Sequence, residues 1–286
     1  MRNMKEFCEI LAPIADVKFA KKIIRAGATA LYCGLDGFSS RPKSSDMTVS
    51  DIIKVKEISS KFNVKLYVAI NAAVLDEHIQ EIMKQIRTLD EHGIDAFIVS
   101  DIGLIHVLTK ANINADLHIS TLAGVNNVET VRYYKSLGCK RIILSSDLYI
   151  DEIAEIIDQC NDIEYEIVAD GGICFNNNHQ CNLPHFNEKN EFCVLCQSEF
   201  KLLEKGNPIK NALPIGNPPA LLHRALGIYI GLGINSFKIE GRTNDIKYVL
   251  KRIKAMDSSR TLYYKNKKEI PGYLHYIYRK VEKNNG

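Results

Sequence analysis

Apolar residues along the chain fall into short β-branched runs that alternate with longer amphipathic stretches. The short runs predict strands at residues 8–13, 28–34, 64–71, 96–101, 115–121, 141–146, 165–170 and 236–241. Between most of them, apolar residues recur at steps of three and four, as in residues 48–62 and 76–93, and predict helices. The predicted strands are apolar on both faces, which is typical of parallel strands covered by helices.

A similar phrase precedes several of these strands: "RAGATALY", "EHGIDAFIVS", "SLGCKRIILS" and "GLGINSFKIE". The glycines in these phrases suit the carboxyl ends of helices that turn tightly into the next strand (Gly27, Gly93, Gly138, Gly233). Eight such strands predict an α/β fold, a (β/α)8 TIM-like barrel. A doubly wound open sheet is the alternative, but the first strand is not followed by the G-x-G-x-x-G of dinucleotide-binding folds.

The size and composition of the chain fit one large domain. With 286 residues and 46% hydrophobic content, the chain can bury a substantial core. We expect the barrel to occupy residues 1–260 and a basic C-terminal tail to occupy residues 261–286. The sequence has neither a signal-peptide apolar region nor a stretch long enough for a membrane span, so we expect a cytoplasmic protein. The net charge of +3, with both signs interspersed, indicates at most a local contact with RNA.

Polar residues collect where the predicted strands end, which is where barrels of this class carry their function. The candidate acid and base groups are His118, Asp170 and Glu240, and the candidate substrate-binding residues are Arg41, Asn71, Asp101, Ser120 and Arg242. Each also has a structural alternative. Asp101 and Asn127 are placed to cap the helices that follow them, and Arg242 could form an ion pair with Glu240 or with a neighbouring helix.

Half of the eight cysteines lie in one segment after the seventh predicted strand. This cysteine loop, residues 171–200, contains Cys174, Cys181, Cys193 and Cys196 and has no helical or strand period. In a reducing compartment such a cluster indicates metal binding or redox chemistry. Four thiolates, or three with His179 or His185, suit both zinc and an iron–sulfur cluster, and the spacing does not decide between them. The other four cysteines are dispersed and predict core positions (Cys8, Cys33, Cys139, Cys160).

The order of "EILAPIAD", "AGATALYCG", "DLHISTLAGVNN", the cysteine loop and "SFKIEGR" resembles the peptidase U32 family, the collagenase-like peptidases. The resemblance covers most of the chain, from about residue 9 to the helix after residue 242. It implies a barrel with a 4Fe-4S cluster on Cys174, Cys181, Cys193 and Cys196. Some members of the family are described as proteases. Others take part in oxygen-independent hydroxylation, either of ring carbons in ubiquinone biosynthesis or of pyrimidines in tRNA and rRNA.

By this resemblance we expect an iron–sulfur protein that acts in, or supports, oxygen-independent hydroxylation of a small aromatic or quinone precursor or of an RNA base. Short members look most like the ubiquinone-pathway pair, which suggests a hetero-oligomer with a related subunit. A prephenate-like hydroxyl donor is the implied small-molecule partner, and Arg41 or Arg242 would hold its carboxylate. The alternatives are a U32-type peptidase, supported by the family name alone, and a zinc-stabilised binding protein.

Overall fold

The computed structural model describes residues 8–40, 46–172, 203–208, 219–222, 225–242 and 245–265. The barrel strands are β1 (Glu9–Pro13), β2 (Ala30–Leu35), β4 (Lys65–Ile70), β5 (Ala96–Val99), β6 (Asp116–Ile119), β7 (Arg141–Ile143), β8 (Glu164–Gly172) and β12 (Ser236–Ile239). They are parallel, and β1 pairs with both β12 and β2, so the sheet closes on itself. The predicted (β/α)8 barrel is therefore confirmed. The open doubly wound sheet is wrong, because it would leave two unpaired edge strands.

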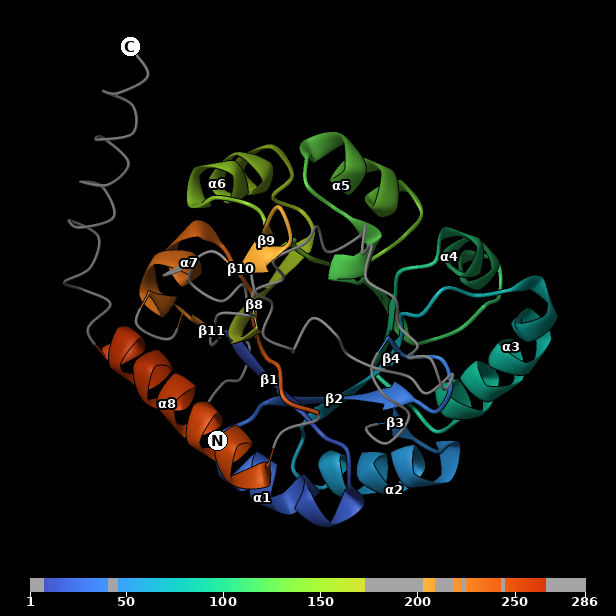
Figure 1. Ribbon diagram of the computed structural model, residues 1–286. Helices are drawn as coiled ribbons and strands as arrows, with labels where there is room; N and C mark the ends of the chain where they lie inside the picture. Colours follow the sequence, from blue (N-terminus) through green and yellow to red (C-terminus); the bar gives the residue numbers. More distant parts are fainter. Residues whose placement is uncertain are drawn as a thin grey trace.

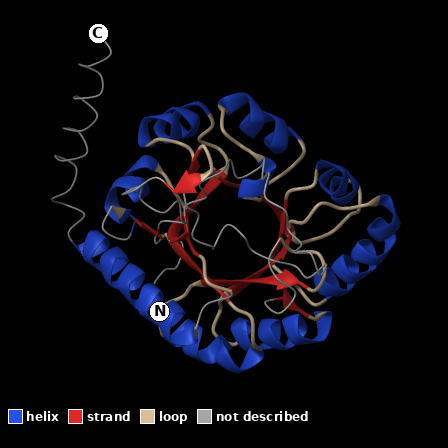
Figure 2. Cartoon of the chain, viewed as in Figure 1, coloured by secondary structure: helices blue, strands red, loops and turns tan. Residues whose placement is uncertain are grey.

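A helix follows each barrel strand, and the helices form a ring around the ring of strands (Figures 1 and 2). They are α1 (Ala20–Arg25), α2 (Val49–Ser60), α3 (Asp76–Glu91), α4 (Ile102–Thr109), α5 (Val128–Ser136), α6 (Ile150–Gln159), α7 (Leu226–Leu232) and α8 (Ile246–Lys265). Short 3-10 turns at Val17–Phe19 and Thr121–Ala123 precede α1 and α5. In the described ranges, no helix is long and apolar enough to cross a membrane.

Local signals explain where several helices begin and end. The four glycines predicted to end helices all have positive φ, from +75° to +117°. Gly27, at +117°, shows why: this backbone conformation strains any residue that has a Cβ atom. At the other helix end, the Asn127 side chain accepts a hydrogen bond from the Thr130 N–H at 2.9 Å, so its predicted capping role is confirmed.

The barrel has two apolar regions. The larger region lies between the strands and the surrounding helices and contains the four described cysteines, as predicted (Cys8, Cys33, Cys139, Cys160). A smaller cluster is contributed by inward-facing positions of β1, β2, β4, β5 and β7 and fills the middle of the barrel (Leu11, Ala30, Tyr32, Tyr67, Ala69, Ala96, Ile98, Ile143). The barrel is therefore a packed core with polar groups above and below this layer.

The carboxyl ends of the strands carry short additional strands. The two-residue strand β3 (Asp46–Met47) extends the sheet beside β2, and β9 (Leu203–Glu204) pairs with β10 (Asn207–Pro208). Strand β11 (Pro219–Leu221) pairs antiparallel with β8, so that Pro219 lies opposite Gly172. The chain therefore leaves the barrel after β8 and returns to the same place at β11. The intervening residues include the predicted cysteine loop, of which only Gly171 and Gly172 are among the described residues.

Candidate functional site at the carboxyl rim of the barrel

Hydrogen bonds bring together polar residues at the ends of three neighbouring strands, β4, β5 and β6. The Asn71 Nδ2 donates to Ser120 Oγ at 3.5 Å, and Asn71 Oδ1 accepts from the Ser40 N–H at 3.1 Å. The Ser100 hydroxyl donates to the Asn71 carbonyl oxygen at 3.1 Å. Of the predicted substrate-binding residues, Asn71 and Ser120 thus share one side of the rim, where amide and hydroxyl groups lie close together.

Arg242 lies just beyond β12 and forms a buried ion pair. Its Nη1 is 3.1 Å from Asp46 Oδ1 and 3.0 Å from Ser39 Oγ, and its side chain is only 6% exposed. The guanidinium also lies 5.8 Å from the centre of the Tyr32 ring. The structural alternative predicted an ion pair of Arg242 with Glu240 or with a neighbouring helix. The structure contains an ion pair, and its partner is Asp46 on β3.

The backbone of β2 makes room for this pair because residue 34 is a glycine. A Cβ atom on Gly34 would lie 2.0 Å from Arg242 Nη1 and 2.1 Å from Asp46 Oδ1. Burial raises the pKa of the Asp46 carboxyl to about 6, against the lowering effects of the Ser39 hydrogen bond and of the Arg242 charge. Asp46 therefore changes its charge close to neutral pH. Sequence reasoning missed both Ser39 and Asp46, because neither follows an apolar run directly.

Glu240 and Asp170 lie side by side at the ends of β12 and β8. The Glu240 N–H donates to the Asp170 carbonyl oxygen at 2.7 Å. The Glu240 side chain covers Gly171, where an added Cβ atom would lie 2.7 Å from Glu240 Cγ. The buried Asp170 carboxylate accepts a hydrogen bond from the Tyr248 hydroxyl at 3.4 Å and pairs with Arg252 at 3.5 Å, both on α8. The structure therefore brings these two acids together, with Asp170 attached to α8.

His118 lies inside the barrel on β6 and is 3% exposed. Its ring meets the Tyr67 ring edge-on at 4.7 Å, and its Nδ1 has no hydrogen-bond partner among the described residues. Burial, together with the positive charges of Arg141, Lys65 and Lys238, lowers the pKa of His118 well below its usual value. The imidazole is therefore neutral at physiological pH, and it can accept or donate a hydrogen bond without carrying charge.

Of the remaining predicted site residues, Asp101 caps a helix and the others lie outside the described residues. Asp101 Oδ1 accepts a hydrogen bond from the Leu104 N–H at 2.8 Å, so its predicted capping role at α4 is confirmed. Its other oxygen accepts from the Val74 N–H at 3.4 Å. Arg41 lies outside the described residues, as do the predicted metal ligands of the cysteine loop (Cys174, Cys181, Cys193, Cys196).

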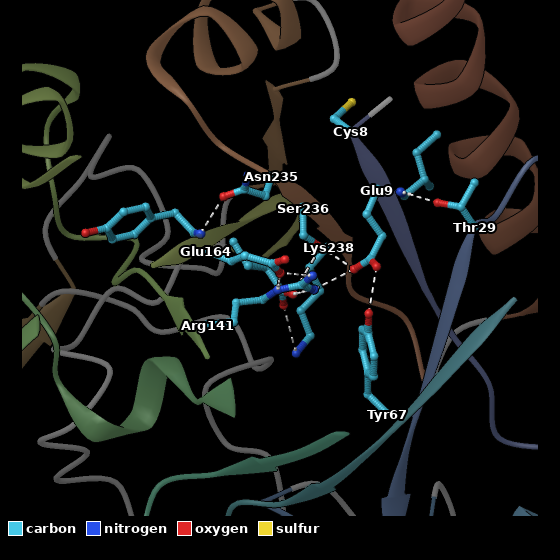
Figure 3. A network of polar contacts seen from close by, with 12 residues as sticks. Cys8, Glu9, Thr29, Tyr67, Arg141, Glu164, Asn235, Ser236 and Lys238 are labelled. Carbon is cyan, nitrogen blue, oxygen red and sulfur yellow. Dashed lines mark hydrogen bonds and ion pairs between the residues drawn. The ribbon is translucent and has the colours of Figure 1, made fainter. Parts of the chain in front are cut away.

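Below the apolar layer, the barrel interior contains a charge network centred on Arg141, which is 3% exposed (Figure 3). Its Nη1 lies 2.6 Å from Glu9 Oε1 and 3.2 Å from Glu166 Oε2, and its Nη2 lies 2.6 Å from Glu164 Oε2. Glu166 is completely buried. These residues come from the beginnings of β1, β7 and β8, so the network lies at the amino end of the barrel.

Polar groups from β4 and β12 complete this network. The Tyr67 hydroxyl donates to Glu9 Oε2 at 2.7 Å, and the Ser236 hydroxyl donates to Glu9 and Glu166. Lys238 Nζ lies 3.7 Å from Glu166 Oε1 and 4.3 Å from the Tyr32 ring centre. Sequence reasoning missed the network as well. Its signal is the presence of charged residues within runs that are otherwise apolar, as in "CEILAP" and "SFKIEG".

Three of the four described cysteines do not resemble metal ligands. Burial raises the thiol pKa of Cys8 and Cys139 to about 11 and that of Cys33 to about 12, so these residues remain protonated at neutral pH. Metal ligation requires the thiolate. In the described part of the chain, no group of three or more His, Cys, Asp or Glu side chains is arranged to hold a metal ion.

The fold and the polar rim define a TIM-type barrel with its candidate site at the carboxyl ends of the strands. The chain belongs to peptidase family U32, whose family model matches residues 15–284. The resemblance predicted from the sequence is therefore confirmed.

Two similar proteins are named for RNA hydroxylation. The chain is 28% identical over 250 residues to the Escherichia coli 23S rRNA 5-hydroxycytidine C2501 synthase, covering 84% of this chain and 37% of the relative. It is 33% identical over 202 residues to the Haemophilus influenzae tRNA hydroxylation protein P, covering 68% of this chain and 44% of the relative. A third relative, the Porphyromonas gingivalis collagenase, is 25% identical over 86% of this chain and 64% of its own length. The chain thus spans less than two thirds of the length of each of these three relatives.

Solved structures support the fold. The U32 peptidase Mk0906 aligns with a TM-score of 0.54 and 10% identity, over 82% of this chain and 93% of its own. A 2,3-dimethylmalate lyase aligns with a TM-score of 0.50 and 11% identity, over 100% and 96% of the two chains. At such low identity these likenesses show the shared barrel and nothing about the reaction.

Proposed function

We propose that this chain takes part in oxygen-independent hydroxylation of a base in tRNA or rRNA. The observation that carries the proposal is that relatives named for tRNA and rRNA hydroxylation align over 68–84% of the chain. Of the two substrate classes expected from the sequence, these names favour the RNA base over a small quinone precursor. A hetero-oligomer with a related subunit stays a prediction.

For the cofactor, we propose a 4Fe-4S cluster held by Cys174, Cys181, Cys193 and Cys196, with a single zinc ion as the alternative. The four described cysteines support this assignment, because they are buried and dispersed and therefore form no competing group of ligands. When bound, such a cluster would supply electron transfer. Its ligands would lie on the chain between β8 and β11, two strands that pair at the rim.

The rim residues would bind and orient the reacting groups. Asn71, Ser100 and Ser120 offer amide and hydroxyl groups that can hydrogen-bond a pyrimidine edge. Arg242, held by Asp46, would attract the carboxylate of a prephenate-like hydroxyl donor, a role for which Arg41 remains the other candidate. Glu240 is the candidate to move a proton at the rim.

Asp170 and His118 would act beside Glu240. The Asp170 carboxylate is held by α8, which keeps its backbone carbonyl in place for the Glu240 N–H. His118 is neutral and buried, so its proposed acid–base role depends on proton transfer through the barrel interior rather than on direct exposure at the rim.

The experiment that tests the proposed function is nucleoside analysis of tRNA and rRNA from a strain that lacks the gene. We expect one hydroxylated pyrimidine to disappear from the mass spectrum and to return when wild-type protein is expressed. The Cys193→Ser and Glu240→Gln proteins should not restore it. If every hydroxylated nucleoside persists without the gene, the proposal is wrong.

A second measurement tests the cofactor separately. Protein purified without oxygen should contain about four irons and four sulfides per chain, and the Cys193→Ser protein should contain less. One zinc ion without visible colour would contradict the cluster.

Because one relative is named collagenase, peptidase activity is the second candidate function for this chain. Within the described ranges, no hydrogen bond joins a histidine ring to a serine, threonine or cysteine side chain, the contact that activates most such nucleophiles. We expect no cleavage of gelatin by the purified protein. Cleavage that survives Cys193→Ser would favour the peptidase over the hydroxylation protein.

A further inference from the structure

The first half of α8 carries a stripe of exposed lysines. Lys247, Lys251 and Lys254 are spaced by four and then three residues, so they lie on one face of the helix. At 1.5 Å per residue the stripe is about 10 Å long. The opposite face buries Val249 and Ile253 against the barrel, so the lysine face points outward.

Helix α1 packs beside α8 and extends this basic surface (Figure 1). It exposes Lys21, Lys22 and Arg25 and contains no acidic residue. In α8 the only acid is Asp257, which pairs with Arg260. None of the three α1 cations or the three α8 lysines forms an ion pair with an acidic side chain in the described part of the chain.

Two helices elsewhere in the ring have the opposite charge to this surface. Helix α6 contains four acids and no lysine or arginine (Asp151, Glu152, Glu155, Asp158). Helix α3 has more acids than cations as well. In Figure 1 both helices lie away from the neighbouring pair α1 and α8. The small net charge of +3 therefore conceals an uneven outer surface, with an excess of cations on α1 and α8 and an excess of acids on α3 and α6.

We propose that the exposed cations of α1 and α8 form a surface that binds the phosphate backbone of the substrate RNA. This inference rests on the proposed function, since it names the surface that would hold the substrate while one base reaches the rim. Each helix follows a barrel strand, so its first turn lies at the carboxyl rim. The contacts of Arg252 and Tyr248 with Asp170 attach the same part of α8 to the rim.

The lysines of α8 lie close enough to the rim to hold an RNA strand beside it. Lys247 lies in the first turn of α8, and Lys254 follows about 10 Å further along the helix. A strand of RNA held by these lysines would pass close to the rim, and a nucleotide turned out of the strand could enter it. Lysine ammonium groups bind phosphates as point charges, so the contact would be independent of sequence and sensitive to salt.

The test is the salt dependence of tRNA binding by the full chain, measured by fluorescence anisotropy on protein purified without oxygen. The variant carries Lys247→Gln, Lys251→Gln and Lys254→Gln. Each phosphate contact contributes about 0.7 to the slope of log K against log salt for single strands, so we expect the slope to fall by about 2. This corresponds to about 100-fold weaker binding at about 0.1 M salt.

The matched control carries Lys84→Gln, Arg87→Gln and Lys110→Gln, three exposed cations on α3 and at the end of α4. It loses the same charge at another place, and its slope should equal that of the wild type. Equal losses in both variants would show that only net charge matters and would overturn the proposed surface. Circular dichroism checks folding, and if the triple variant does not fold, Lys251→Gln alone should lower the slope by about 0.7.

The surface and the proposed function can fail independently. Wild-type protein that binds vesicles of anionic lipid more tightly than tRNA, or that binds no tRNA, would overturn the RNA surface. In either case, loss of a hydroxylated nucleoside from the strain without the gene would still support the proposed function. Conversely, lysine-dependent tRNA binding supports the surface even where that nucleoside persists, and then the proposed function alone is wrong.

Discussion

Two buried arginines, one near each end of the barrel interior, have different surroundings. Arg141 at the amino end is 3% exposed and contacts three carboxylates. Arg242 at the carboxyl rim is 6% exposed, and its ion pair in the described part of the chain is with a single carboxylate, that of Asp46. In barrels of this class, the amino end contributes to stability and the carboxyl end carries function. The protein therefore has a buried arginine–carboxylate pair at the end that contributes to stability and another at the end that carries function.

The difference between them lies in how firmly the charges are fixed. Three acids surround Arg141 and the nearby Lys238, and Glu166 is completely buried, so removal of the guanidinium would leave an excess of buried negative charge. At the rim, the single partner Asp46 has a pKa raised by burial to about 6 and therefore changes charge near neutral pH. The amino end is thus a fixed structural network, whereas the rim can respond to pH and to an arriving anion.

The largest expected effect is the loss of the Arg141 guanidinium. The substitution Arg141→Met keeps most of the volume but leaves Glu9 without its cation and Glu166 with only Lys238, at 3.7 Å. Breaking a buried pair in this way costs about 3–5 kcal/mol, so the free energy of unfolding measured with urea should fall by that amount. The control is Arg132→Met on α5, whose pair with Glu129 is exposed and contributes less than about 1 kcal/mol. Similar losses in the two variants would show that the network around Arg141 is not a fixed structural element.

The second prediction concerns Gly34, which makes room for the rim pair. In Gly34→Ala the new Cβ atom would lie 2.0 Å from Arg242 Nη1, so the Asp46–Arg242 pair must move. We expect a loss of about 2–3 kcal/mol in unfolding free energy, and restoration of the hydroxylated nucleoside should fail. Gly103→Ala is the control, because its Cβ atom meets only Asp101 Oδ1, at 3.2 Å. It should change stability by less than about 1 kcal/mol and restore the nucleoside.

The third prediction is a pH dependence that belongs to Asp46. Its folded pKa is raised from 3.8 to about 6, so the folded protein keeps a proton that the unfolded chain has already lost. This stabilisation is complete below the unfolded pKa and disappears as pH rises through the folded pKa. Allowing for partial solvent screening, wild type should lose about 1–2 kcal/mol more than Asp46→Asn between about pH 4 and pH 7. Parallel curves for the two proteins would contradict the raised pKa.

The features that the sequence predicted correctly depend on neighbours along the chain. Strand periodicity, the helix-ending glycines and the Asp101 cap are local, and all were confirmed by the structure. The two arginine sites depend on contacts across the barrel, since Glu9 and Arg141 are 132 residues apart and Asp46 and Arg242 are 196 apart. A single sequence does not show which distant residues meet. Charged residues within apolar strands signal a polar interior, but they do not identify the pairs.

The smallest expected effect concerns His118, which lies inside the barrel beside Tyr67. Burial and three nearby cations lower its pKa, so its NMR signals should stay constant between about pH 5.5 and pH 8, where an ordinary imidazole titrates. Since its Nδ1 has no hydrogen-bond partner among the described residues, His118→Phe should change the unfolding free energy by less than about 1 kcal/mol. A stable variant that fails to restore the hydroxylated nucleoside would assign His118 to the functional rim. A stable variant that restores the nucleoside would show that the His118 ring only fills the packed interior, as a structural residue. If His118 instead titrates near its usual pKa, the barrel interior near Arg141 accommodates another positive charge. The charges of the Arg141 network would then be held less firmly than its buried acids indicate.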